Sequence, residues 1–97
     1  MAFLPEEFEW DEGNETKNKE KHGVEIRECE EVFMNAPHII WRDKKHSTTE
    51  ERFIILGKTN IGRELHIVYT VRHQKIRVIS ARDQNKKERS FYASQSN

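Results

Sequence analysis

The sequence has no apolar run long enough to cross a membrane, and it contains a single cysteine. A membrane helix needs about 18 or more consecutive apolar residues, and no apolar cluster here approaches that length. The acidic N-terminus also lacks the basic segment of a secretory signal peptide. Cys29 alone cannot form an intramolecular disulfide, which suits a reducing compartment, and its helical spacing predicts a core position. We therefore expect a cytoplasmic protein without a membrane partner.

The motifs of several enzyme classes are missing as well. The chain contains no GxSxG, Walker A, HExxH or CxxC motif. His46 and Glu50 are the nearest approach to a metal site, and two candidate ligands without a third do not make one. We expect no metal and no other cofactor, so any chemistry must come from basic and polar side chains.

The net charge of zero hides an uneven distribution of charge. Residues 1–51 hold 14 acidic and 7 basic residues, a net of −7, whereas residues 52–97 hold 3 acidic and 10 basic residues, a net of +7. A basic half favours a polyanionic partner such as nucleic acid. The alternative is that the two halves neutralise each other across the fold, and charge alone favours that alternative.

The hydrophobic pattern predicts one α+β domain over residues 1–97, with frayed ends at 1–6 and 94–97. The expected order is a strand (8–10), two helices (11–22 and 24–34), four strands (39–41, 52–58, 65–71 and 75–81) and a helix (85–93) capped by Asp83. Short turns between consecutive strands make the sheet an antiparallel meander, with the helices packed against it.

Basic side chains of the second half lie on the predicted sheet rather than in a tail. Strict alternation places Arg77 on the same face as Ile79 and Ala81, where its guanidinium can remain exposed. Arginines on a sheet can bind phosphates bidentately, although a solvated sheet face is an equally simple interpretation. The aromatic residues that could stack on bases are Trp41, Tyr69 and Tyr92.

Lys21 and His22 end the polar first helix and are candidates for proton transfer. Histidine is the usual general acid or base near neutral pH, and a neighbouring lysine would attract a phosphate. The alternative is a pair that only complements the helix dipole.

Motifs in a fixed order resemble the BrnT family of toxins over residues 8–92. They are Phe8-Glu9-Trp10-Asp11, Asn18, Lys21-His22-Gly23-Val24, Glu31-Val32-Phe33, His46-Ser47, Glu51-Arg52, Gly57, Gly62-Arg63, Val68-Tyr69-Thr70, Arg77, Ile79-Ser80-Ala81-Arg82, Glu88-Arg89 and Tyr92. Two positions depart from the family pattern: Asn14 stands where a lysine is frequent, with Lys17 one turn later, and Gln84 stands where an alanine is usual.

The resemblance implies a RelE-like fold and a ribonuclease toxin of a type II toxin–antitoxin system that halts translation. It implies a BrnA-like antitoxin as partner, in a heterotetramer that represses its own operon, so that operator DNA is bound only through the antitoxin. The motif positions that it marks in this chain are Lys21, His22, Glu51, Arg52, Arg77, Arg82, Glu88 and Tyr92.

The expected chemistry is metal-independent cleavage of RNA, in which a 2′-hydroxyl attacks the adjacent phosphorus. Arg77 and Arg82 would bind the scissile phosphate. Lys21 or His22 would transfer a proton, with Glu51 as the alternative base and Arg52 as its neighbour or ion-pair partner. The residues expected to bind flanking RNA are Lys17, Arg63, Arg72, Lys75 and Tyr92.

Two other functions fit the sequence. One is a catalytically weak homologue that binds its antitoxin for operon control, which the departure at Asn14 favours. The other is a structural domain without an RNA role, in which the charged halves neutralise each other.

Overall fold

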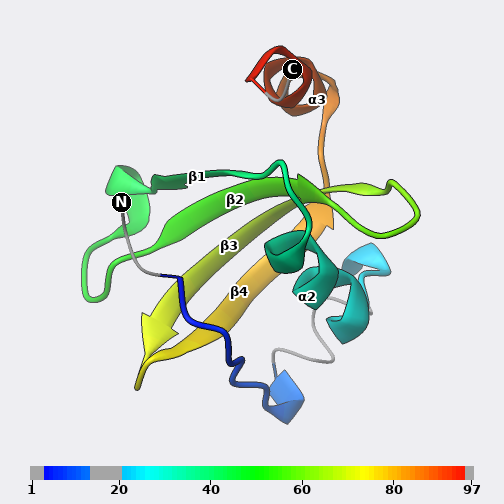
Figure 1. The fold of residues 1–97 in the computed structure, drawn as a ribbon. Coiled ribbons are helices and arrows are strands. Elements are labelled where there is room, and N and C mark those ends of the chain that lie inside the picture. Colours follow the sequence, from blue (N-terminus) through cyan, green and yellow to red (C-terminus); the bar gives the residue numbers. More distant parts are fainter. Residues whose placement is uncertain (1–3, 14–20, 96–97) are drawn as a thin grey trace.

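The structure is a computed structural model of the chain and describes residues 4–13 and 21–95. Its elements are α2 (Ile26–Met34), β1 (Ile39–Arg42), a 3-10 turn (Lys44–His46), β2 (Phe53–Lys58), β3 (Glu64–Arg72), β4 (Lys75–Asp83) and α3 (Lys86–Gln95). The strands form one antiparallel sheet in the order β1-β2-β3-β4 (Figure 1). The predicted α+β class, four-strand meander and C-terminal helix are confirmed.

The predicted order, with a leading strand and two N-terminal helices, is wrong. The described elements run α-β-β-β-β-α. Phe8 makes only an isolated parallel bridge to Ile76, because just two backbone hydrogen bonds of 2.8 Å join residues 7–9 to that strand. The predicted helix 11–22 falls mostly on residues 14–20, outside the described residues. The described elements do not show the RelE-like arrangement.

Helix α2 begins where its sequence supplies a cap. Glu25 and Glu28 form a capping box, in which the Glu28 carboxylate accepts a hydrogen bond from the Glu25 backbone N–H at 3.1 Å. Cys29, Val32 and Phe33 recur at helical spacing and are buried against the sheet. The helix is therefore stabilised by one apolar stripe and by a cap that satisfies an otherwise unpaired backbone donor.

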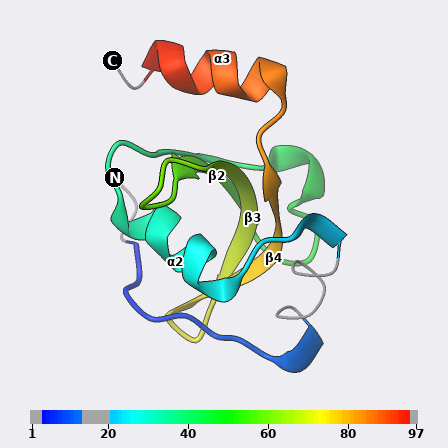
Figure 2. The ribbon, with the colours of Figure 1, turned by 90° about the vertical axis from the view of Figure 1, so that its right-hand side faces the viewer.

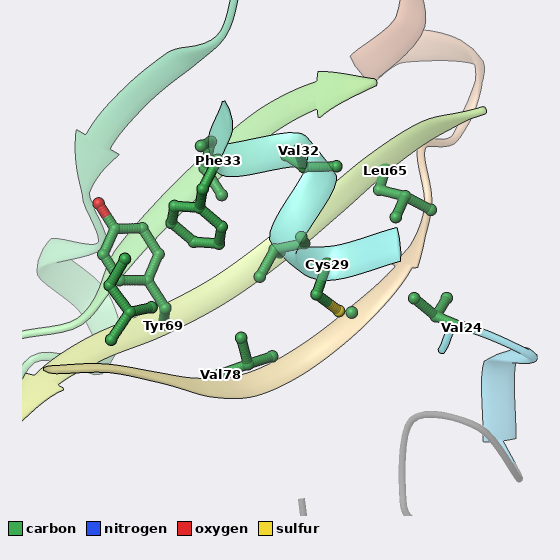
Figure 3. Packing of buried hydrophobic residues seen from close by; sticks show 11 residues of the cluster. Val24, Cys29, Val32, Phe33, Leu65, Tyr69 and Val78 are labelled. Atoms are coloured by element: carbon green, nitrogen blue, oxygen red, sulfur yellow. The ribbon is translucent and has the colours of Figure 1, made fainter. Parts of the chain in front are cut away.

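The main hydrophobic core fills the space between α2 and one face of the sheet. Figure 3 shows Cys29, Val32 and Phe33 beside the side chains of Tyr69 and Val78. Burial raises the pKa of the Cys29 thiol to about 12, so Cys29 is a core residue, as predicted, and not a reactive thiol.

Gly57 sets how closely α2 approaches β2. A Cβ at this position would lie 2.8 Å from Cγ1 of Val32, a distance too short for two carbon atoms. The glycine at a buried strand position is therefore explained by the packing of helix on sheet.

Helix α3 lies on the far side of β1 and β2 from α2 (Figure 2). It is capped by Asn85: the Glu88 N–H donates to Asn85 Oδ1 at 2.8 Å, and the Asn85 N–H donates to Glu88 Oε1 at 2.9 Å. The predicted cap, Asp83, is wrong because β4 continues through that residue. Tyr92 is the buried residue of α3, and its hydroxyl donates to the Pro37 carbonyl at 2.6 Å.

None of the described helices is long and apolar enough to span a bilayer.

Candidate functional site

Two of the predicted site residues, Arg77 and Arg82, lie on the sheet face opposite α2. The odd-numbered residues 65–69 of β3 are buried under α2, so His66 and Thr70 face the other way. Arg82 pairs with His66 across the β3–β4 ladder, and Arg77 pairs with Thr70. Register partners project from the same face, so both arginines lie on the side away from α2.

A β-bulge makes this shared face possible. Because Arg82 stands five positions after Arg77, an odd number, strict alternation would put the two side chains on opposite faces. The β3–β4 register shifts by one residue and leaves Ile79 without a register partner, which restores the two arginines to one face. The prediction that Arg77 shares a face with Ala81 is wrong, since Ala81 is buried in the core on the α2 side.

Arg52 belongs to the same face. The Asp43 N–H donates to the Arg52 carbonyl at 2.7 Å and so extends the β1–β2 ladder by one residue. Phe53 packs against the core under α2, which leaves Arg52 on the opposite side. Its Nε is buried and has no hydrogen-bond partner among the described residues. We refer to the surface of Arg52, Arg77 and Arg82 as the arginine face.

The N-terminal segment supplies carboxylates to Arg77. The Arg77 guanidinium donates to Asp11 Oδ2 at 2.6 Å and to Glu9 Oε1 at 3.3 Å. The hydrogen bond to Asp11 raises the pKa of Arg77, which therefore stays charged. A phosphate at this position would have to compete with these two carboxylates.

Arg82 forms a bidentate pair with Glu88 of α3, at 2.8 and 2.9 Å. This pair lowers the pKa of Glu88 to about 2. Nε2 of His66 lies 3.6 Å from the same carboxylate, and burial lowers the pKa of His66, so its imidazole is neutral at pH 7. Nδ1 of His66 is buried without a hydrogen-bond partner among the described residues.

Sequence reasoning missed His66. Its signal was present, because a histidine that alternates with Leu65 and Ile67 must lie on the face away from the core. Its pairing with Arg82 depends on the strand register, which the sequence did not give.

Arg63 is bound by internal groups. It donates to both carboxylate oxygens of Asp83 (2.7 and 3.1 Å) and to Glu28 (3.0 and 3.1 Å), and it also donates to the backbone carbonyls of His22 and Gly23. Every edge of its guanidinium is engaged, which argues against the predicted contact with RNA.

The proton-transfer candidates lie toward opposite ends of the sheet. Lys21 and His22 are exposed, and the His22 carbonyl accepts a hydrogen bond from Arg63 beside Asp83, at the end of β4 and on the α2 side of the sheet. Glu51 precedes β2 at the other end and pairs with Arg42 at 3.4 Å, rather than with Arg52. Since β2 spans roughly 17 Å, the structure does not bring these two sets together.

The other predicted RNA contacts differ in their surroundings. Arg72 pairs with Glu50 at 3.0 Å. Lys75 is partly buried at the start of β4, and Tyr92 is almost fully buried. Lys17, like Asn14, lies outside the described residues.

The cluster around His46 does not gather three ligands. His46 Nδ1 lies 2.9 Å from Asp43, and Glu50 turns away to Arg72. Within residues 4–13 and 21–95, no group of three His, Cys, Asp or Glu side chains could hold a metal ion.

Ion pairs link the acidic and basic halves of the chain. The first-half acids and their second-half partners are Glu9 and Asp11 with Arg77, Glu28 with Arg63, and Glu50 with Arg72. Part of the charge asymmetry is therefore neutralised inside the fold, whereas Arg82 pairs within its own half.

Comparison with known proteins identifies the family. Curated proteins give no match. A family model described as "Ribonuclease toxin, BrnT, of type II toxin-antitoxin system" matches residues 10–88, which include Lys21, His22 and the whole arginine face. The match covers well over half of the chain, and the chain therefore belongs to the BrnT family of ribonuclease toxins of type II toxin–antitoxin systems.

Proposed function

We propose that the chain is a metal-independent endoribonuclease that cleaves RNA, thereby inhibits translation, and binds its substrate on the arginine face. The observation that carries this proposal is the gathering of Arg52, Arg77 and Arg82 on one face, for which the fold requires a bulge. Fixed cations aimed at a phosphate stabilise the negative charge that develops as the 2′-hydroxyl attacks phosphorus.

The spacing of the arginines favours contacts with different phosphates, in place of the shared scissile phosphate predicted from the sequence. Their register partners are four residues apart on β3, so the Cα atoms of Arg77 and Arg82 lie roughly 13 Å apart. We place the scissile phosphate at Arg82, because Lys21 and His22 lie at that end of the sheet, from which an exposed side chain would reach around the edge strand β4 to the arginine face. One of these two side chains would transfer the proton, and Arg77 and Arg52 would hold phosphates further along the strand.

The alternative register puts the scissile phosphate at Arg77, with Glu51 as the base. Single-turnover cleavage by purified variants separates the two. In the preferred register, His22→Ala or Lys21→Ala lowers the cleavage rate at saturating RNA by roughly 10²-fold, and Glu51→Ala changes it little. The reverse pattern would move the reaction to the Arg77 end.

The assignment of the arginine face is tested by toxicity and cleavage. Arg77→Ala and Arg82→Ala should each relieve growth arrest and reduce cleavage while the protein stays folded. Arg27→Ala is the matched control, since Arg27 is an exposed arginine of α2, on the other side of the sheet. Glu88→Gln breaks the ion pair between Arg82 and α3 but keeps Arg82, so it separates the loss of that pair from the loss of the RNA contact. If both arginine variants stay as toxic as the parent at equal expression, the assignment is wrong.

The metal-independent mechanism has its own test. Purified protein, freed of antitoxin, should cleave RNA at an undiminished rate in excess EDTA. Complete loss of cleavage, restored by a divalent cation, would contradict the proposal.

For partners, we propose a BrnA-like antitoxin that forms a heterotetramer with this chain and provides the contact with operator DNA. A small neighbouring gene for a DNA-binding protein is the first observation to make. Co-expression followed by light scattering would then give the stoichiometry.

A second candidate function is a weakly active homologue that serves mainly to bind its antitoxin. The observation that favours it is the pairing of Arg77 and Arg82 with the protein's own carboxylates, which compete with phosphate. Purified chain that binds its antitoxin but leaves RNA uncut would support this function over the first.

A further inference from the structure

Two large aromatic side chains lie together on the surface. Trp41 of β1 and Phe91 of α3 form an edge-to-face pair with ring centroids 6.1 Å apart. Trp41 remains 38% exposed and Phe91 45% exposed. Both leave large apolar surfaces in water, whereas the other described aromatic side chains are buried or partly buried.

The pair borders the arginine face. Trp41 starts a row that crosses the whole sheet and continues through Ile54, Val68 and Ser80. This row lies on the side away from α2, between the row of Arg82 and the row of Arg77. Three strand spacings separate Trp41 from Ser80, which is roughly 14 Å. RNA that crosses the strands from Ser80 would therefore reach Trp41 within a few nucleotides.

The charges beside the pair favour an anionic occupant. Lys44 and Lys45 are exposed and lie just after Asp43, which follows the end of β1, whereas Arg42 at the end of the strand is paired with Glu51. The nearest acid in this segment, Asp43, is engaged by His46 at 2.9 Å. An aromatic surface flanked by cations is the usual arrangement for bases that stack while the backbone is held electrostatically.

We infer that Trp41 and Phe91 form a nucleobase-stacking subsite for single-stranded RNA, a few nucleotides away from the phosphate held at Arg82. The inference rests on the proposed ribonuclease function. It adds a binding site for a base that is not adjacent to the cleaved phosphate. Stacking is sequence-tolerant, so this subsite strengthens binding to unpaired RNA and discriminates against duplexes, whose bases are already stacked.

The experiment measures binding without cleavage. A fluorescently labelled single-stranded oligonucleotide with 2′-O-methyl groups has no free 2′-hydroxyl to attack, so its affinity does not depend on catalysis. Fluorescence anisotropy should show that Trp41→Ala and Phe91→Ala each weaken binding by about 10-fold or more. Trp41→Leu, which keeps an apolar side chain but has no aromatic face, should weaken binding equally.

An independent signal comes from the tryptophan itself. In a Trp10→Phe background Trp41 is the one tryptophan left in the chain, and oligonucleotide binding should quench its fluorescence. A series of oligonucleotides with a single abasic position should contain one position whose loss weakens binding to the parent but not to Trp41→Ala.

The controls and the contrary outcomes are specific. Ile61→Ala removes an 88% exposed apolar side chain elsewhere and should leave the affinity unchanged. Unchanged affinity in folded Trp41→Leu and Phe91→Ala would overturn the inference, as would variants that lose the antitoxin but keep the oligonucleotide. If the oligonucleotide quenches Trp41 fluorescence but the chain does not cleave RNA, the proposed ribonuclease activity is wrong. The base-stacking subsite would still be supported.

Discussion

Arg63 donates hydrogen bonds to two carboxylates and two backbone carbonyls, so a single side chain ties residues 22–23 and the start of α2 to the end of β4. The Glu28 carboxylate that it binds is buried and also caps α2. A buried carboxylate is tolerated only when its charge is paired. At the scale of single residues, this arginine therefore acts as a structural cation.

Arg63→Ala should lower the free energy of unfolding by about 3 kcal/mol, because it leaves Glu28 buried without its cation. Urea denaturation measures the change. Arg27→Ala removes an exposed arginine that also contacts carboxylates, and it should cost about 0.5 kcal/mol or less. Equal effects of the two substitutions would show that Arg63 has no special structural role.

Glu88 gives the stability a defined dependence on pH. Its pKa is lowered from 4.5 to about 2 in the fold by the bond to Arg82, so the folded state favours the charged form. The stabilisation is therefore complete above pH 4.5 and is lost as the pH falls toward 2. Glu88→Gln should remove about 2 kcal/mol at pH 6 and flatten the decline between pH 4.5 and 2, as measured by urea denaturation at a series of pH values. An unchanged decline would assign the acid sensitivity to other carboxylates, of which Asp83 is the first candidate because the hydrogen bond from Arg63 lowers its pKa.

At the scale of elements, the β3–β4 hairpin carries both a strained turn and the bulge that makes the site. His73 and Gln74 have φ values of 54° and 62°, as a two-residue type I′ turn requires, although neither residue favours that region. The turn falls between the strands predicted at 65–71 and 75–81, although its two residues lack the Asn-Gly signature of such turns. The long β3–β4 ladder holds the turn in this conformation, although its two residues disfavour it.

Replacing His73→Asn and Gln74→Gly together should raise the free energy of unfolding by about 1 kcal/mol, because both new residues accept positive φ more readily. Thermal unfolding would detect this as an increased midpoint. Gln74→Ala is the matched control, since alanine in the left-handed region keeps the strain. A decrease in stability for the double substitution would mean that His73 or Gln74 makes a contact of its own.

At the scale of the whole molecule, ion pairs join the acidic and basic halves of the chain but neutralise only part of their charge. Three second-half arginines are paired with first-half acids, whereas Arg52, Lys44 and Lys45 form no ion pair within residues 4–13 and 21–95. The two hypotheses about the uneven charge, self-neutralisation and a polyanion partner, are therefore compatible. Because the family consists of ribonuclease toxins, RNA is the polyanion that we propose for the arginine face.

The charge of the arginine face predicts the salt dependence of RNA binding. With about three phosphates contacted by Arg52, Arg77 and Arg82, log Kd for single-stranded RNA should rise with log salt with a slope of about 2. Arg52→Ala should reduce that slope by about 0.7, and Arg27→Ala should leave it unchanged. A slope near zero for the parent would mean that binding does not depend on these cations.

The sequence by itself determined the four strands, the C-terminal helix, the stripe of α2 and the burial of Cys29, because each of these follows from the local period of apolar residues. It did not predict the bulge at Ile79, the isolated bridge of Phe8 or the cap at Asn85, since these depend on which backbone groups meet in space. The same limit applied to the site. Arg77 and Arg82 were identified from motif positions, yet only the tertiary structure placed them on one face, paired His66 with Arg82, and moved Arg63 and Tyr92 into internal contacts. Strand register and side-chain pairing are set by the packing of the whole sheet, which no local pattern in the sequence contains.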